Sequence, residues 1–349
     1  MRLPSTPFLL LVPALLAGLL AAPPASAVTA TTVATARPTT TAATATATAT
    51  ATTPQVTETW VGPRLLDLTW YSANVGTTVQ VRLLLPKSWK RSTTRTWPAV
   101  FALQGGRDDY TSWTRETDIE GLAARWDVMV VMPTGGVNGS YTDWWNDGEG
   151  GTPRWETFHT VELMNLLKQR YHAGTKRAVI GASSGGQGAM SYAGRHPGMF
   201  RYAASFSGST HLTKDGMQAF LVTVNLLGFG TDAFRIFGLP GRDDANWRAH
   251  DPYHLAPRLR GVGLYVSSGT TGLNGPYTPP GGQWRLTQLS EILIGQMNHS
   301  FVARLKALGI PVTTHIYGNG WHAWPEWIPE LGKAWPLMMK AIDAKGTPA

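Results

Sequence analysis

The sequence predicts one large α/β domain, residues 56–349, with a mostly parallel central sheet and helices on both faces. Short runs rich in β-branched residues alternate along it with longer segments whose apolar residues recur every three or four positions. The chain has 349 residues, of which 43% are hydrophobic and 15% charged. It is therefore long and apolar enough to bury a sizeable core.

The strands and helices follow each other in that alternating order. The predicted strands are residues 78–85, 99–103, 128–132, 178–180, 203–206, 263–267 and 312–317. The predicted helices are residues 118–126, 157–171, 187–195, 286–308 and 329–343, each with the apolar spacing of a helix packed on a sheet. Because strand and helix alternate, most strands are expected to run parallel.

The N-terminus has the pattern of a secretory leader. Arg2 precedes an apolar stretch over residues 8–22, and Ala25-Ser26-Ala27 forms a small-residue cleavage site. The stretch is shorter than the roughly 20 residues that span a bilayer, and Pro13 interrupts it. We expect residues 1–27 to be a signal peptide and the mature protein to be secreted, extracellular or attached to the cell wall, with no transmembrane segment after cleavage.

Residues 28–55 are a low-complexity segment. They contain 13 Thr and 9 Ala, and Arg37 is their only charged residue. Such a segment offers neither a helical period nor core residues. We expect a disordered stalk, which acts as a passive spacer or carries O-glycans.

Composition excludes several classes of function. The formal net charge is +8, but no run of basic residues concentrates it, so nucleic acid is not an expected partner. The chain has no cysteine, which excludes disulfides, thiolate metal sites and a cysteine nucleophile. The histidines are not spaced beside acidic residues as metal ligands would be, so no metal or cofactor is expected.

A candidate nucleophile lies in Gly181-Ala182-Ser183-Ser184-Gly185, a G-x-S-x-G pattern. The pattern follows a predicted strand and precedes a predicted helix, which is the setting of a nucleophile elbow. The alternative is a plain glycine-rich turn. Ser184 is the rival serine, but only Ser183 has the flanking glycines in register.

A serine needs a base, which in such an arrangement lies late in the chain on a loop after the last strand. His299, His315 and His322 are the histidines beyond residues 263–267. His299 falls within a predicted helix and His315 within a predicted strand. His322 follows the last strand and Gly318-Asn319-Gly320, so it is the predicted base.

The acid that orients this histidine is expected after the preceding long strand. Between Pro252 and Trp324, Glu291 is the only carboxylate. Asp243, Asp244 and Asp251 also lie between serine and histidine, but they precede that strand. Glu291 is therefore the predicted acid, although a lone glutamate on a helix is ordinarily a solvated charge.

Two backbone N–H groups are expected to hold the oxyanion of acyl transfer. One is that of Ser184, which follows the nucleophile. The second is predicted at Gly106, because a strand ends there in Gln104-Gly105-Gly106 and a tight turn exposes its amide.

With these residues in place, the chain resembles the antigen 85 family of secreted mycolyltransferases, acyltransferases and esterases with the α/β-hydrolase fold. The resemblance covers nearly the whole domain, and by it the family's nucleophile, acid and base fall on Ser183, Glu291 and His322. The matching blocks are Gly106-Arg107-Asp108-Asp109-Tyr110 with Trp113, Val131-Met132-Pro133 with Gly135-Gly136, Asp143-Trp144, Trp155-Glu156-Thr157-Phe158, the serine elbow, Ser205-Phe206-Ser207-Gly208, Asp251-Pro252 and Asn319-Gly320-Trp321-His322-Ala323-Trp324-Pro325.

The resemblance also implies that Gln104, Arg107 and Trp324 contact a sugar. Gln104 stands where the family has an aspartate, so a charged acceptor for sugar hydroxyls is lost. Gly106 replaces a bulky residue, which predicts a wider site. Residues 217–240, rich in Phe, Leu and Val, are expected either to hold a long acyl chain or to pack as a cap on the main domain.

The predicted function is transfer of a long acyl chain between envelope glycolipids, with trehalose as a candidate acceptor, by a monomeric serine enzyme. One alternative is a secreted carboxylesterase for short or aromatic acyl esters. Another is a glycan- or matrix-binding wall protein on the same fold. Turnover of p-nitrophenyl butyrate separates the enzymes from the binding protein, and an acyl-trehalose product separates transferase from esterase.

Overall fold

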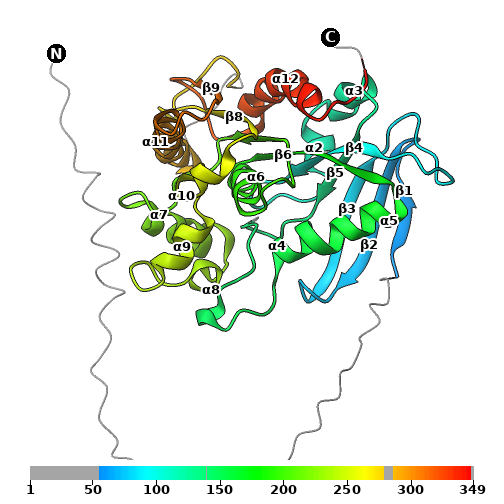
Figure 1. Ribbon diagram of the computed structural model, residues 1–349. Helices are drawn as coiled ribbons and strands as arrows, with labels where there is room; N and C mark the ends of the chain where they lie inside the picture. Colours follow the sequence, from blue (N-terminus) through cyan, green and yellow to red (C-terminus); the bar gives the residue numbers. More distant parts are fainter. Residues whose placement is uncertain (1–54, 139, 279–285, 347–349) are drawn as a thin grey trace, which may run out of the picture. The chain divides into compact units, whose positions relative to one another are not determined.

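A computed structural model describes residues 55–138, 140–278 and 286–346. Nine strands form one sheet in the order β1-β2-β3-β5-β4-β6-β7-β8-β9 (Figure 1). The strands are β1 (Thr57–Trp60), β2 (Leu65–Ser72), β3 (Thr77–Leu84), β4 (Trp97–Leu103), β5 (Met129–Pro133), β6 (Ala173–Ala182), β7 (Tyr202–Phe206), β8 (Gly263–Ser268) and β9 (Thr313–Ile316). From β5 to β9 neighbouring strands are parallel, whereas β1, β2, β3 and β5 pair antiparallel. The predicted mostly parallel sheet is confirmed.

Helices cover both faces of this sheet, as predicted. Side chains of α5 (Leu163–Arg170), α6 (Ser184–Arg195) and α11 (Leu286–Ala307) pack in the core on one face. Side chains of α2 (Ser112–Glu116), α3 (Ile119–Ala124) and α12 (Trp324–Ala341) pack in the core on the other. A short helix, α4 (Trp155–Thr157), continues into α5 through a π-helical turn (Phe158–Glu162).

The segment between β7 and β8 forms a helical cap, which groups at one side of the sheet in Figure 1. It contains α7 (Met217–Thr223), a π-helical segment (Val224–Phe229), α8 (Ala233–Phe237), α9 (Asp244–His250) and α10 (Pro252–Leu255). The cap has a small core of its own, made by Leu212, Val222, Ala233, Ile236, Phe237 and Trp247. Met217 instead packs against Ile294 and Met297 of α11. Part of the apolar segment 217–240 therefore packs as a cap, whereas Leu226 and Leu227 are exposed, so binding of an acyl chain by this segment stays a prediction.

The predicted signal peptide, residues 1–27, and nearly all of the predicted stalk, residues 28–55, lie outside the described residues. Within the described part of the chain, no helix combines the length and apolar character needed to cross a bilayer.

Candidate active site

Ser183 occupies the turn between β6 and α6. Its backbone angles are φ 55° and ψ −125°, a conformation that a residue with a Cβ adopts only under strain. The Ser183 N–H donates to the carbonyl oxygen of Phe206 at 2.8 Å, and the Ser183 carbonyl accepts from Gly186 N at 2.9 Å. These bonds hold the serine at the carboxyl edge of the parallel strands.

The two motif glycines are required by close backbone packing. A Cβ on Gly181 would lie 2.1 Å from the carbonyl carbon of Gly185. A Cβ on Gly185 would lie 2.4 Å from the carbonyl oxygen of Leu103, at the end of β4. Both distances are too short for a real Cβ, so only glycine lets the turn fold against the neighbouring strand.

His322 links Ser183 to Glu291. His322 Nε2 lies 2.8 Å from Ser183 Oγ, and His322 Nδ1 lies 2.7 Å from Glu291 Oε2. The imidazole sits between β9 and α12, where the Trp327 indole packs edge to face with it at 5.1 Å between ring centroids. The structure thus brings the three predicted residues together in the hydrogen-bonded arrangement of a serine–histidine–acid triad.

Glu291 is fully buried in α11, and each of its carboxylate contacts comes from a donor. Oε1 accepts from Ser207 Oγ at 2.8 Å and from Gly269 N, directly after β8, at 2.6 Å. Trp327 Nε1 donates in turn to Ser207 Oγ at 3.0 Å. With His322 this gives the carboxylate three hydrogen-bonded contacts among the described residues, which fix its orientation. Ser207 and Trp327 were not predicted for this role; the block containing Ser207 entered only through the family resemblance.

The rival histidines and acids lie elsewhere. His299 is exposed on α11, and His315 pairs with Glu330 at 2.8 Å. Asp243 accepts from the backbone N–H of Leu239, and Asp251 from that of Thr213. His315, Asp243 and Asp251 therefore make local contacts away from Ser183.

Gly106 and Ser184, the two predicted oxyanion donors, flank the serine. A Cβ on Gly105 would lie 3.4 Å from Ser183 Cβ, so the loop after β4 runs directly beside the nucleophile. Ser184 is the first residue of α6, where an N–H has no partner within the helix. No described residue accepts from the N–H of either Gly106 or Ser184, so both amides can bind an incoming oxygen.

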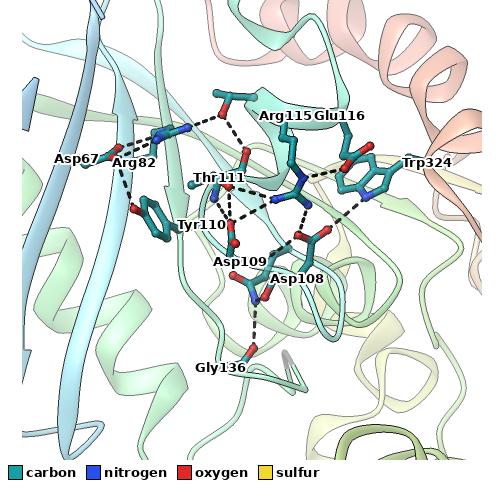
Figure 2. Close-up of polar contacts among 12 residues, drawn as sticks. Asp67, Arg82, Asp108, Asp109, Tyr110, Thr111, Arg115, Glu116, Gly136 and Trp324 are labelled. Atoms are coloured by element: carbon teal, nitrogen blue, oxygen red, sulfur yellow. Dashed lines mark hydrogen bonds and ion pairs between the residues drawn. The ribbon is translucent and has the colours of Figure 1, made fainter. Parts of the chain in front are cut away.

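The loop after β4 is held by a polar network, shown in Figure 2. Asp108 accepts from Arg115 Nη2 at 2.5 Å and from Trp324 Nε1 at 3.2 Å. The hydrogen bond to Asp108 is the largest cause that raises the pKa of Arg115, so the guanidinium remains charged. Trp324 also packs against Trp113 and Trp327. The predicted sugar contact Trp324 is therefore also part of the support of this loop.

Gln104 is buried, only 1% exposed, and faces the protein. Its Nε2 donates to the carbonyl oxygens of Asp108 at 2.5 Å and Gly136 at 3.0 Å. The backbone oxygen of Gln104 accepts from the Tyr141 hydroxyl at 2.8 Å; burial raises the pKa of Tyr141, which keeps this donor protonated. This geometry does not offer the predicted contact between Gln104 and a sugar hydroxyl, because the amide ties two loops together instead.

Arg107 is the predicted sugar contact that remains accessible. Its backbone has φ 60°, and its N–H donates to Val137 O at 2.5 Å, which fixes the turn. Its side chain is exposed, and its guanidinium makes no hydrogen bond or ion pair with the described residues. The cation is therefore available to oxygen atoms of a ligand.

The geometry agrees with the comparisons to known proteins. A model of the Esterase family matches residues 72–338, most of the chain. The chain belongs to this family. Among its relatives, the diacylglycerol acyltransferase/mycolyltransferase Ag85B of Mycolicibacterium smegmatis is 31% identical over 257 residues, which cover 70% of this chain and 77% of that protein. The predicted membership of the antigen 85 group is confirmed.

A second relative is the esterase Rv1288 of Mycobacterium tuberculosis, 29% identical over 264 residues and 74% of this chain. The chain spans only 56% of that esterase's length. Among solved structures, MPT51 of Mycobacterium tuberculosis matches with a TM-score of 0.60 and 25% identity, over 78% of this chain and 96% of MPT51. The α/β-hydrolase fold expected for this esterase-family chain is confirmed.

Gly106 does not widen the site, contrary to the sequence expectation. The Phe229 ring of the cap fills the place of the missing side chain: a Cβ on Gly106 would lie 2.5 Å from Phe229 Cζ. The space that a side chain at position 106 would take is filled by a residue distant in sequence.

Among the described residues, three side chains that could bind a metal ion lie close together. The ligand atoms of His211, Asp251 and His254 lie within 4.8 Å of one another. Thr213 hydrogen-bonds both Asp251 Oδ2 at 2.8 Å and His254 Nε2 at 3.0 Å, and His211 Nδ1 lies 2.7 Å from Ser300 Oγ. These bonds give the cluster a structural role in joining the cap to α11.

The burial of Gln104 leads to a prediction about the effect of an aspartate at this position. Gln104→Asp should lower both ester turnover and stability, because a carboxylate would face the carbonyl oxygens of Asp108 and Gly136 without a donor. The loss of stability should be about 1–3 kcal/mol, measured by urea denaturation. Gln55→Asp makes the same change at an exposed site and should be neutral. Undiminished stability with a higher share of transfer to trehalose would show that position 104 contacts sugar after all.

Proposed function

We propose that this chain is a secreted serine acyltransferase or esterase of the mycolyltransferase type. It transfers a long acyl chain between envelope glycolipids, esters of trehalose, through an acyl-serine intermediate. The observation that carries the proposal is the hydrogen-bonded triad of Glu291, His322 and Ser183, next to two backbone amides that have no partner among the described residues. The relatives named mycolyltransferases support the substrate class.

In the first half-reaction, Ser183 Oγ attacks the ester carbonyl carbon and its proton passes to His322 Nε2. The carbonyl oxygen becomes an oxyanion, which the N–H groups of Gly106 and Ser184 stabilise. The bond to the leaving alcohol then breaks, His322 returns the proton to that alcohol, and the acyl group remains on Ser183. Glu291 holds the imidazole in the tautomer with Nδ1 protonated and stabilises the imidazolium.

In the second half-reaction, an acceptor hydroxyl attacks the acyl-serine and His322 takes its proton. The bond between the acyl carbon and Ser183 Oγ then breaks, and His322 returns the proton to Ser183 Oγ. Arg107 is exposed and its cation is unpaired among the described residues, so it is the side chain proposed to bind the oxygens of a sugar acceptor. Trp324, half-buried and hydrogen-bonded to Asp108 of the same loop, is proposed to offer an aromatic face to the sugar. The relay is complete within one chain, which supports a monomeric enzyme. The leader pattern of residues 1–27 supports export.

A plain carboxylesterase is the second candidate, favoured by one observation. Gln104 is buried and engaged by two backbone carbonyls, so position 104 offers a sugar no charged acceptor. Without a well-held acceptor, water would take the acyl group from Ser183. Both candidates share the first half-reaction and differ only in the second.

The products decide between them. We would incubate the full-length mature protein with trehalose monomycolate and measure every product by mass spectrometry, with Ser183→Ala as the control. Trehalose dimycolate as the main product supports the transferase. Free mycolic acid with no dimycolate would show that the protein is an esterase and contradict the transferase. If neither this substrate nor p-nitrophenyl butyrate is turned over, both enzyme functions fail and a binding protein is the remaining hypothesis.

A further inference from the structure

We infer that Phe229 determines the acyl specificity of this enzyme, by limiting how wide an acyl group fits next to the ester carbonyl. The inference rests on the proposed function, because it concerns the acyl group bound to Ser183. In this inference, a residue of the cap limits the width of the site, as a side chain at position 106 would otherwise do.

The contact between Phe229 and Gly106 is the first argument. A Cβ on Gly106 would meet three atoms of the Phe229 ring, at 2.5, 2.9 and 3.1 Å. The ring therefore touches the Gly106 backbone and leaves no room for a side chain there. Because the Gly106 N–H is a proposed oxyanion donor, the ring borders the position of the substrate carbonyl.

The ring is held in this place by its segment. Phe229 ends the π-helical segment, and Gly230 reverses the chain with φ 65° directly after it. At the other end, Asn225 Oδ1 accepts from Asn138 Nδ2 at 3.3 Å, and Asn225 Nδ2 donates to Leu221 O at 2.8 Å. Asn138 is buried in the loop after β5, next to the backbone that Arg107 contacts. At the Phe229 end, the backbone N–H groups of Gly230 and Thr231 both donate to the carbonyl oxygen of Asn225, so the segment is held at both ends.

The segment that carries Phe229 also exposes two large apolar side chains. Leu226 and Leu227 of the same segment are 39% and 82% exposed, whereas other large apolar residues of the cap, such as Phe237 and Ile236, are buried in its core. An exposed apolar pair on the same segment as Phe229 is suited to contact the tail of an acyl chain. The Phe229 ring contacts the loop at Gly106, and the two leucines precede it on the same segment, so the proposal puts the carbonyl end of the acyl group at the ring and its tail along the leucines.

The test compares two esters that differ in width next to the carbonyl: p-nitrophenyl butyrate, which is linear, and p-nitrophenyl pivalate, which is branched. Phe229→Ala should raise the ratio of kcat/KM for pivalate to that for butyrate by about tenfold, since one methylene in a specificity pocket changes kcat/KM by roughly 10–200-fold. Phe229→Leu, which keeps more of the packing, should give a smaller rise in the same direction. Phe234→Ala removes the same ring from the cap's own core and should leave the ratio unchanged. An unchanged ratio in both Phe229 variants would overturn the inference.

A second measurement tests the contact itself and needs no substrate. Gly106→Ala should lower the Tm of the wild type, because the new Cβ forces the ring aside, and should have little effect in the Phe229→Ala background. Equal losses in both backgrounds would overturn the inference. If no ester is turned over at all, the proposed function fails, while this Tm cycle still reports whether Phe229 occupies the side-chain space of position 106.

Discussion

Replacing Ser183 by alanine should lower kcat for ester turnover by about 10⁶-fold, because the change removes the only atom that can form the acyl-enzyme. His322 and Glu291 would remain, but without the nucleophile they contribute almost nothing to the rate of ester turnover. Turnover of p-nitrophenyl butyrate measures the loss.

Ser184→Ala is the matched control. The Ser184 Oγ is buried and has no hydrogen-bond partner among the described residues, while its backbone N–H, the proposed oxyanion donor, is unchanged by the substitution. We expect kcat to stay within a few-fold of the wild type. A large loss of kcat in Ser184→Ala, with activity retained in Ser183→Ala, would show that the nucleophile is Ser184 and that our assignment is wrong.

Replacing Glu291 by glutamine should lower kcat by about 10³–10⁴-fold, the second-largest effect expected. The three groups that contact this carboxylate are all donors: His322 Nδ1, Ser207 Oγ and Gly269 N. A glutamine amide carries two donor hydrogens of its own, so it must face at least one of these donors. Either the backbone contact is lost, or the imidazole is held in the wrong tautomer and cannot accept the proton of Ser183.

Asp251→Asn is the control for this prediction, because Asp251 is equally buried and was a rival for the role. It accepts from the N–H groups of Thr213 and Tyr253, so its loss should affect the stability of the cap more than kcat. Circular dichroism would show which variants are folded. Loss of kcat in folded Asp251→Asn, with full activity in Glu291→Gln, would contradict the assignment of the acid.

The parallel part of the fold could be predicted because its strands are buried on both faces and read as continuous apolar runs. β1 could not: it has four residues, most of them exposed, at the edge of the sheet. The short helices of the cap were missed as well, since none of them is longer than seven residues and a helical period needs about two turns to show. α12 begins at Trp324, before the predicted start at residue 329, because Pro325 occupies the first turn, where a missing N–H costs nothing.

The candidate relay could be predicted because chain order and local context restrict the choices at each step. The surroundings of the relay could not. Whether Gln104 faces a sugar or the protein depends on Gly136, on a loop from another strand, and the sequence does not show that pairing. The prediction that Gly106 widens the site was wrong, because Phe229, which fills the space of the missing side chain, belongs to the cap, far away in the sequence.

The central claim is that Ser183 forms a covalent intermediate, and covalent labelling tests it most directly. The mature protein would be treated with a fluorophosphonate, which reacts with activated serines, and analysed by intact mass and peptide mapping. The account predicts one adduct per chain, located on Ser183, and none in Ser183→Ala or after loss of the His322 imidazole. An adduct on another residue, or ester turnover that persists in a wild-type protein with no adduct, would contradict it.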